Sequence, residues 1–462
     1  MTSTSEGSSL NFASGTIWTG DCLEVMRGIN SETIDLIYLD PPFNSNANYA
    51  APVGSQAAGA AFKDTWTLSD VDAEWINLIE QKHPAVHRVL LAAMTNSDKS
   101  YLAYMAARLL EMPRLLKPTG SIYLHCDPTM SHYLKLLMDA VFGRRNFKNE
   151  ITWKRTSSRS DAKRYGRIHD TLLYYVRGSE ATWNGAWEPH DEEYVNRFYR
   201  HSDESGRRYM LDNMASPNPR PNMTYTWRGF PPPEKGWRFE RETMQRLHDE
   251  GRIWYPPSTD RRPRLKRYLD EQQGRAAGDV ITDINPIGAQ AKERLGYPTQ
   301  KPLALLERVI KASSNEGDMV LDPFCGCATT LVAADRLDRQ WVGMDLSAKA
   351  AELVVQRVEA EQGLWKNIIH RADIPQRDDL GPLPAYNSPA NKQQLYGQQG
   401  GDCAGCGTHF QPQHLTVDHI IAQSKGGTDH LDNLQLLCAH CNSVKGDRGM
   451  EYLRAKLQLH PA

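Results

Sequence analysis

The pattern that most restricts the fold of this chain lies at residues 317–346. A short apolar stretch, 319–321, precedes a tight turn, and an apolar helical face follows at 330–337. A second apolar stretch, 341–344, ends at Asp345. A strand, a turn, a helix and a second strand in this order predict a parallel α/β sheet. Ligands bind such sheets at the carboxyl ends of the strands, where Asp345 could bind ribose hydroxyls.

Another apolar stretch, Ile34–Leu39, also predicts a buried parallel strand, and it ends at Asp40-Pro41-Pro42-Phe43. The Asp40 carboxylate can accept a hydrogen bond from an exocyclic amine, and the Pro41 carbonyl can accept a second one. The prolines stiffen the backbone, and the Phe43 ring offers a stacking face for a base. Taken alone, these four residues could also be an ordinary stop between a strand and a loop.

Residues 40–43 resemble the catalytic motif of the DNA amino-methyltransferases, and residues 322–328 resemble the S-adenosylmethionine loop of that family. The catalytic strand precedes the donor loop, which is the order of the family's β group. The resemblance implies a Rossmann-like, S-adenosylmethionine-dependent methyltransferase sheet of the α/β class. A plain dinucleotide site is the competing hypothesis, but the G-x-G-x-x-G fingerprint is absent from the sequence. The resemblance implies these cofactor-binding residues: Asp21, Cys22, Thr299, Lys301, Asp322, Pro323, Phe324, Gly326 and Asp345.

Two positions bear on activity. Ala328 stands where the family usually has its last glycine. We expect cofactor binding to survive this change provided that the backbone angle φ of Ala328 is negative. Aspartate rather than serine at position 40 favours adenine N6 over cytosine N4 as the accepting amine, a family tendency that leaves cytosine open.

Between these motifs, the sequence predicts helices at 98–117 and 132–142 and a strand at 121–125. The segment 167–175 resembles the family's late strand beside the base pocket. We expect His169, in that segment, to line the pocket or support the fold, because methylation of an amine needs no strong general base.

Aromatic residues and arginines interleave from residue 183 to 284, where β-group enzymes carry a target-recognition region. Arginine and lysine attract phosphates, and arginine forks suit base edges in the major groove. A loop-rich, solvated insertion is the other interpretation. The densest basic cluster consists of Arg261, Arg262, Arg264, Lys266 and Arg267.

The C-terminal segment 395–462, here called the tail, is too short to build a large apolar core without a stabilising cross-link such as a bound metal. It holds two Cys-x-x-Cys pairs, which predict a structural zinc site rather than unpaired thiols. The cysteines of these pairs are Cys403, Cys406, Cys438 and Cys441.

The same segment resembles the zinc-bound HNH, or ββα-metal, nuclease family through Asp418-His419, Asn433 and Asn442. The resemblance implies that His419 is the general base and that Asp418 and Asn442 hold Mg²⁺ or Mn²⁺. It also implies that Asn433 orients His419 or its loop. The alternative is a zinc knuckle that only binds DNA.

These observations predict five segments: a methyltransferase catalytic half, an inserted target-recognition region, an S-adenosylmethionine-binding half, a linker and an HNH endonuclease domain. Their predicted bounds are 10–180, 181–285, 286–370, 371–394 and 395–462. The formal net charge of −2 excludes a uniformly basic nucleic-acid binder, so we expect local patches to contact double-stranded DNA. No apolar stretch in the sequence is long enough to suggest a membrane partner, and we expect a cytoplasmic protein from a prokaryotic or phage-like setting. The sequence leaves open whether the chain forms a homodimer.

The function predicted from these features is site-specific DNA methylation, most consistent with adenine N6, joined to DNA cleavage or nicking in one restriction-modification polypeptide. One alternative is an orphan methyltransferase whose zinc-held tail only binds DNA. Another is an RNA methyltransferase, because a pocket for a flipped amine does not itself demand deoxyribose.

Overall fold

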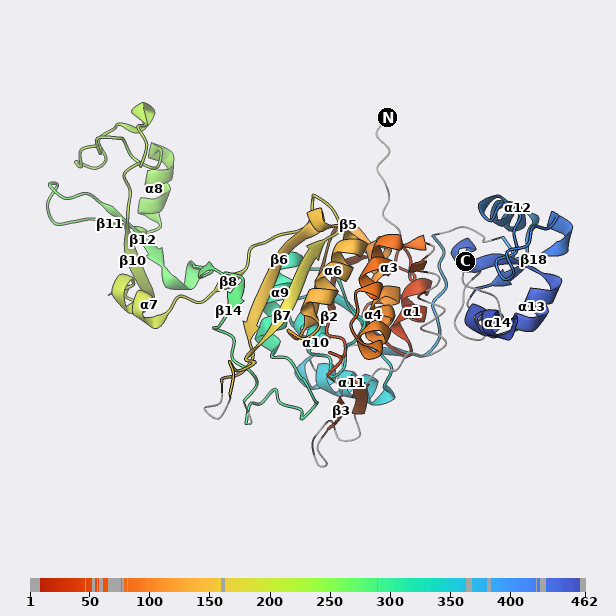
Figure 1. The fold of residues 1–462 in the computed structure, drawn as a ribbon. Coiled ribbons are helices and arrows are strands. Elements are labelled where there is room, and N and C mark those ends of the chain that lie inside the picture. The colour runs from red at the N-terminus through yellow and green to blue at the C-terminus, as the bar shows by residue number, and fades with distance from the viewer. Residues whose placement is uncertain are drawn as a thin grey trace. The chain divides into compact units, whose positions relative to one another are not determined.

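The computed structural model describes residues 9–45, 47–51, 55, 57, 61–64, 76, 79–80, 82–158, 163–288, 290–362, 368–379, 384–420, 422–423 and 429–457. Contacts divide the chain into two compact units (Figure 1), residues 186–277 and the remainder. None of the described helices is both long enough and apolar enough to cross a membrane.

A nine-stranded sheet forms the centre of the larger unit. Strand β7 runs antiparallel to its neighbours β5 and β6, whereas the other neighbouring pairs are parallel. In spatial order the strands are β14 (Val280–Ile281), β6 (Phe147–Lys154), β7 (His169–Val176), β5 (Leu116–Cys126), β2 (Ile34–Leu39), β15 (Met319–Asp322), β16 (Gln340–Asp345), β1 (Thr16–Thr19) and β17 (Ile369–Arg371).

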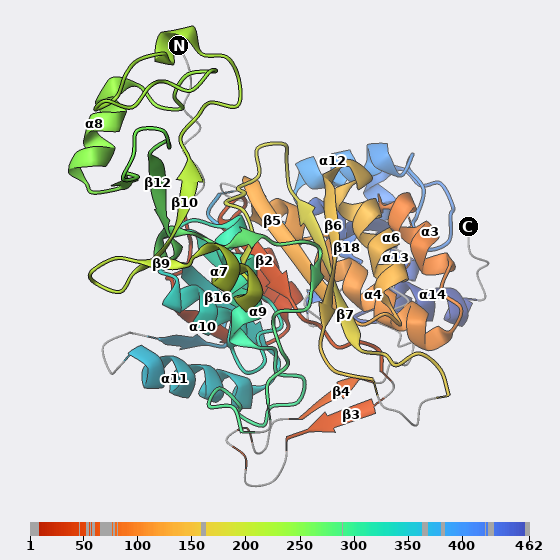
Figure 2. The same cartoon turned by 90° about the vertical axis from the view of Figure 1, so that its left-hand side faces the viewer.

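Helices cover both faces of this sheet, as Figure 2 shows. Alternate side chains of a strand point to opposite faces, so Ile37 of β2 joins one apolar core and Tyr38 joins the other. The first core is covered by α1 (Cys22–Gly28), α3 (Pro84–Leu91), α4 (Asn96–Leu109), α5 (Met112–Leu115) and α6 (Ser131–Phe142). The second is covered by α9 (Leu303–Ser313), α10 (Thr329–Arg336) and α11 (Ala348–Gln362). A short hairpin, β3 (Ala47–Ala50) and β4 (Ala61–Asp64), follows the Asp-Pro-Pro-Phe segment.

Most predicted elements of this unit are confirmed. Helix α6 matches the helix predicted at 132–142, and β15, α10 and β16 occupy the segments predicted around the donor loop. The single helix predicted at 98–117 is wrong, because α4 ends at Leu109 and a separate short helix, α5, carries Pro113 in its first turn. Proline has no N–H to donate, so it favours the first turn of a new helix over the interior of a continuous one.

Residues 186–277 form the second unit, which has an apolar core of its own around Trp227, Trp237 and Met244. Its main sheet has the order β11 (Ile253–Trp254), β12 (Arg264–Tyr268), β10 (Arg208–Asn213) and β9 (His201–Ser202). A second small sheet pairs β8 (Trp187–Glu188) with β13 (Arg275–Ala276), and the helices are α7 (Glu192–Phe198) and α8 (Arg241–Asp249). The segment is therefore a compact unit, although long turns and loops join its short elements and several of its aromatic side chains belong to its own core.

Near the C-terminus, a two-stranded sheet and three helices surround a small apolar core that includes Leu395, Leu436 and Leu453. Its elements are α12 (Pro389–Gln398), β18 (Leu415–His419), β19 (Leu434–Cys438), α13 (Ala439–Lys445) and α14 (Met450–Leu457).

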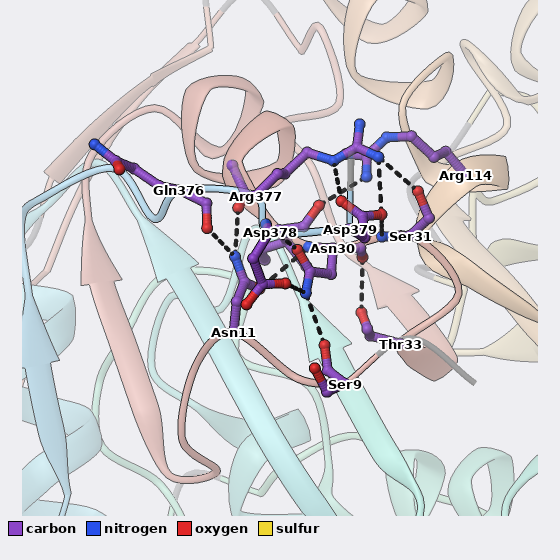
Figure 3. Close-up of polar contacts among 12 residues, drawn as sticks. Ser9, Asn11, Asn30, Ser31, Thr33, Arg114, Gln376, Arg377, Asp378 and Asp379 are labelled. Carbon is purple, nitrogen blue, oxygen red and sulfur yellow. Dashed lines mark hydrogen bonds and ion pairs between the residues drawn. The ribbon is translucent and has the colours of Figure 1, made fainter. Parts of the chain in front are cut away.

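The first part of the predicted linker, residues 373–379, is packed against the segment between α1 and β2, and we call it the strap (Figure 3). The buried side chain of Asn30 exchanges hydrogen bonds with the main chain and side chain of Asp378. The N–H of Ser31 donates to Asp379 at 2.8 Å. These contacts fix the strap along the edge of the large unit.

Candidate active site

The two segments that the sequence singled out meet in one pocket. Asp40 follows β2 and Gly326 follows β15, and these two strands are hydrogen-bonded neighbours in the sheet. Both residues line a cavity of about 520 Å³. It also brings together these predicted residues: Cys22, Pro41, Pro42, Phe43, Thr299, Lys301, Asp322, Pro323, Phe324 and Asp345.

The two oxygens of the Asp40 carboxylate have different surroundings. Oδ2 accepts a hydrogen bond from the ammonium group of Lys301 at 2.6 Å, and Lys301 is itself buried. Oδ1 is buried and has no hydrogen-bond partner among the described residues. A buried acceptor without a partner is costly, so this oxygen is suited to a ligand that donates an N–H.

The loop after the prolines is held in one shape by Asp64. Its carboxylate accepts hydrogen bonds from the main-chain N–H groups of Phe43 at 3.2 Å, Asn44 at 2.7 Å and Ser45 at 2.8 Å. Asn44 has φ +57°, in the left-handed region that asparagine tolerates better than most residues. The half-buried Phe43 ring is thereby presented at the wall of the pocket.

The donor loop is organised by Asp345. Its Oδ2 accepts from the N–H of Gly326 at 2.9 Å, and its Oδ1 accepts from the N–H of Ser347 at 2.8 Å. Each carboxylate oxygen can accept a further hydrogen bond, so Asp345 could still bind hydroxyl groups. Gly326 has φ +49°, and a methyl group added there would lie 3.2 Å from the ring of Tyr297.

Asp322 lies beneath this loop and is almost fully buried. Burial raises the pKa of Asp322 to about 7, although hydrogen bonds from Thr330 and from the Phe324 N–H oppose the rise. Its carboxylate shapes the turn by accepting the Phe324 N–H at 3.0 Å.

The condition set for Ala328 is not met, because its φ is +67° and it is completely buried. The expectation that cofactor binding survives this change therefore loses the condition on which it was made. Ala328 adopts the left-handed backbone that glycine favours, at the point where the chain turns into α10, and this costs an alanine about 1–2 kcal/mol.

Asp21, which the sequence predicts to bind the cofactor, is bonded to protein groups in the structure. Both of its oxygens bind the buried Arg108 guanidinium, at 2.7 and 2.6 Å, and Oδ1 also caps α1 by accepting the N–H of Leu23 at 2.9 Å. Cys22 lines the pocket, and burial raises the pKa of its thiol to about 12, so the group is a neutral wall.

The sequence missed the group that supports Phe43. The imidazole of His125 stacks against the Phe43 ring, and its Nε2 lies 3.2 Å from Asp170. The sequence predicts His125 only as the end of the strand 121–125, and it predicts a pocket role for His169 rather than for its neighbour Asp170. A histidine near the carboxyl end of a buried strand was the available signal.

The four tail cysteines lie together. Their sulfur atoms are all within 4.8 Å of one another, whereas a tetrahedral Zn–S site has sulfurs about 3.8 Å apart, as follows from a Zn–S bond of about 2.3 Å. Thiolates are the ligands that structural zinc prefers, so Cys403, Cys406, Cys438 and Cys441 fit this metal.

Asp418 and His419 end β18, and each has a close partner. Asp418 Oδ2 binds the fully buried ammonium of Lys445 at 3.1 Å and also accepts from Gln435 at 2.9 Å. The His419 Nε2 lies 2.7 Å from Asp429, a residue that sequence reasoning missed.

The two asparagines of this predicted site lie on other elements of the tail. Asn442, on α13, donates to the Thr416 hydroxyl at 3.1 Å, and the buried Asn433 accepts the Ile420 N–H on its main-chain oxygen at 2.7 Å.

The basic cluster in the second unit contains both side chains that have partners within the unit and side chains that are exposed to solvent. Arg267 pairs with Asp212 at 2.7 Å, and the Lys266 ammonium lies 5.4 Å from the centre of the Tyr209 ring. The side chains of the cluster that are exposed to solvent are Arg261, Arg262 and Arg264.

Comparison with known proteins places this site in a family. Residues 34–356 match the DNA methylase model for N6 and N4 methyltransferases, and residues 403–448 match the HNH endonuclease model. The type II methyltransferase M.EcaI of Enterobacter cloacae is 31% identical over 354 residues, which cover 76% of this chain and 70% of the relative.

Two further relatives are more distant. The Mod subunit of the type III restriction-modification enzyme StyLTI of Salmonella typhimurium is 26% identical over 342 residues, covering 70% of this chain and 50% of that protein. The DNA adenine methyltransferase YhdJ of Escherichia coli is 24% identical over 346 residues, covering 74% and 82%. The match to most of the chain and the identity to M.EcaI show that this chain belongs to the N6/N4 family of DNA methylases and that it carries a C-terminal HNH domain.

Proposed function

We propose that this chain methylates the exocyclic N6 amine of adenine in double-stranded DNA, with S-adenosylmethionine as the methyl donor. The observation that carries the proposal is the buried Oδ1 of Asp40, which has no hydrogen-bond partner among the described residues and belongs to a residue that lines the same pocket as the donor loop. S-adenosylmethionine would supply an electrophilic methyl group on a sulfonium.

The donor loop and its surroundings would hold the cofactor. Asp345 offers acceptors for ribose hydroxyls, and the left-handed Gly326 lets the main chain approach a ligand closely. Tyr104, Phe324 and Tyr297 add aromatic walls to the cavity. These residues match the mixed polar and apolar character of a nucleoside that carries a sulfonium side chain.

The acceptor side would bind a base that has been flipped out of the duplex, at a cost of a few kcal/mol. Asp40 Oδ1 and the Pro41 carbonyl would accept the two amine hydrogens, and Phe43 would stack on the base. Lys301 keeps Asp40 Oδ2 occupied, so Oδ1 would be the oxygen that accepts from the amine. The residues thus align the nitrogen lone pair with the methyl group, which is catalysis by positioning.

Adenine is favoured over cytosine by the aspartate at position 40 and by the kinship to an adenine methyltransferase. Target choice would fall to residues 186–277, where Arg261, Arg262 and Arg264 are available to phosphates and base edges.

Long-read detection of modified bases in DNA from cells expressing the chain tests this proposal. N6-methyladenine at one sequence is expected with the wild type and with His419→Ala, and no modification is expected with Asp40→Ala. N4-methylcytosine would correct the base. An unmodified genome in cells that contain folded wild-type protein would refute the methyltransferase assignment.

We also propose that the tail is a metal-dependent nuclease, so that the chain unites modification and restriction. His419 would act as general base, oriented by Asp429, and Asn433 would fix its loop. Asp418 and Asn442 would hold Mg²⁺ or Mn²⁺, which stabilises negative charge on a scissile phosphate. Zinc at the four cysteines would hold the small domain together.

Cleavage of unmethylated and fully methylated plasmid DNA in Mg²⁺ or Mn²⁺ tests the nuclease. We expect the wild type to nick or cut, His419→Ala to be inactive, and Asp40→Ala to cut like the wild type. Binding of DNA without cleavage by the wild type would instead support an orphan methyltransferase with a DNA-binding tail.

A further inference from the structure

The stacking ring of the proposed base pocket rests on a buried histidine. His125 is the penultimate residue of β5 and is completely buried. Its imidazole lies nearly parallel to the Phe43 ring, at 16° and with 5.9 Å between ring centres. This is an offset stack within the usual range for aromatic pairs. The orientation of Phe43 therefore depends on what holds His125.

His125 is fixed at both ring nitrogens by neighbouring strands. The Tyr38 hydroxyl, on β2, lies 2.8 Å from Nδ1, and the Asp170 carboxylate, on β7, lies 3.2 Å from Nε2. Both partners are buried. One neutral tautomer satisfies both ring nitrogens of His125, because the Tyr38 hydroxyl can donate to Nδ1 while Nε2–H donates to Asp170 Oδ2.

The chain of contacts continues across the sheet to β6. Arg155 follows that strand and pairs with Asp170 at 3.1 Å, and the Trp153 ring meets the imidazole edge-on at 6.1 Å. Burial alone would raise the pKa of Asp170, but the hydrogen bond from His125 and nearby cations hold that pKa below its usual value. The carboxylate therefore stays ionised and keeps the imidazole in place.

On the pocket side, Lys301 connects Phe43 to Asp40. The Lys301 ammonium lies 5.0 Å from the centre of the Phe43 ring and 2.6 Å from Asp40 Oδ2. Lys301 therefore contacts both the stacking ring of Phe43 and the amine acceptor Asp40.

We propose that His125 is a positioning residue for the methylated base, because it fixes the ring plane of Phe43 on which the base stacks. This inference rests on the proposed methyltransferase function and deepens it. A histidine that only filled the core would affect stability alike whether or not Phe43 were present, whereas a positioning residue loses its effect when the ring is removed.

A double-mutant cycle separates these roles. Single-turnover transfer of tritiated methyl from S-adenosylmethionine to unmethylated plasmid DNA is measured for His125→Gln, Phe43→Ala and the double variant. We expect His125→Gln to slow transfer by ~10–100-fold, since misplacement by about 1 Å can cost about 100-fold. In the Phe43→Ala background, the same change should cost less than ~3-fold, since the ring through which His125 acts is gone.

Tyr123→Phe is the matched control, because Tyr123 is buried on the same strand and its hydroxyl bonds to Ser313 at 2.7 Å, away from Phe43. It should leave the rate within ~3-fold of wild type. If His125→Gln does not fold, Asp170→Asn takes its place in the double-mutant cycle with Phe43→Ala. Equal losses with and without Phe43, or a His125→Gln rate within ~3-fold of wild type, would overturn the inference. Absence of methyl transfer by the wild type would overturn the proposed function, and the inference with it.

Discussion

Replacing Asp40 with asparagine keeps the shape of the side chain and reverses what it presents to the pocket. The Lys301 ammonium is a donor without acceptor capacity and lies 2.6 Å from Asp40 Oδ2. The amide of Asp40→Asn must therefore turn its oxygen toward Lys301. Its NH2 group then replaces Oδ1, the buried acceptor that has no partner among the described residues.

The cost to methyl transfer follows from that reversal. A hydrogen bond to a charged group is lost, worth about 1.5–3 kcal/mol, and a donor is left facing the amine, which costs a further 1–3 kcal/mol or so. Together they raise the barrier by about 2.5–6 kcal/mol, which slows the chemical step by roughly 10²–10⁴-fold.

Single-turnover methyl transfer, with enzyme in excess over DNA, measures this step without product release. Isothermal titration with S-adenosylmethionine should show an affinity within ~3-fold of wild type for Asp40→Asn, because the predicted loss is confined to the amine. Asp338→Asn, at an exposed position of the same unit with φ +57°, is the matched control. A rate for Asp40→Asn within ~10-fold of the control, with cofactor still bound, would refute the acceptor role of Oδ1.

The remaining predictions concern the tail, the donor strand and the strap. Chelation of zinc, or Cys438→Ser, should abolish the thermal unfolding transition of the tail and spare that of the methyltransferase core, because a small domain depends on its metal. Calorimetry that shows both transitions unchanged would count against a zinc site. Burial raises the pKa of Asp322 from 3.8 to about 7, so the folded state keeps this carboxyl protonated at pH values where the unfolded chain has lost the proton. The stability that the protonated Asp322 contributes is therefore fully present below about pH 4 and is lost as the pH rises to about 7. Relative to Asp322→Asn, the wild type should lose up to about 4 kcal/mol of unfolding free energy over that window, and parallel pH curves in chemical denaturation would contradict this. A methyl group at Gly28 would lie 1.9 Å from the Pro375 carbonyl oxygen, so Gly28→Ala should expose the strap to trypsin several-fold faster, whereas Gly397→Ala, whose methyl meets no atom within 4 Å, should not.

The sheet and the meeting of the two motifs were readable from the sequence because they depend on local apolar patterning. The strand 34–39 and the strand at 319 each end in polar residues, and parallel strands place such ends at one edge. The cysteine cluster was equally readable, because Cys-x-x-Cys spacing brings two thiolates to one point by itself.

Features set by contacts between distant segments were not readable. The sign of φ at Ala328 depends on how β15 turns into α10, and alanine gives no warning because it usually avoids the left-handed region. The strap had the composition of a linker, yet Asp378 and Asp379 find partners in Asn30 and Ser31, nearly 350 positions earlier. Polar residues that pair across such separations look like solvated loop residues in the sequence.

Lys301 shows how a motif can carry a second task. The sequence placed it beside the cofactor, and it does line that pocket, but its ammonium group binds Asp40. A buried carboxylate that accepts a hydrogen bond from an amine needs a neighbouring cation to offset the cost of burying its charge. A cation that bound both carboxylate oxygens, however, would leave none for the amine. A lysine meets both demands where a two-pronged arginine would not, because a point charge can satisfy one oxygen and leave the other free. Lys301→Arg keeps the positive charge, but it should still impair methyl transfer, because arginine would occupy both oxygens of Asp40. Single-turnover rates for this variant equal to those of the wild type would show that Oδ1 is not the oxygen on which the chemistry depends.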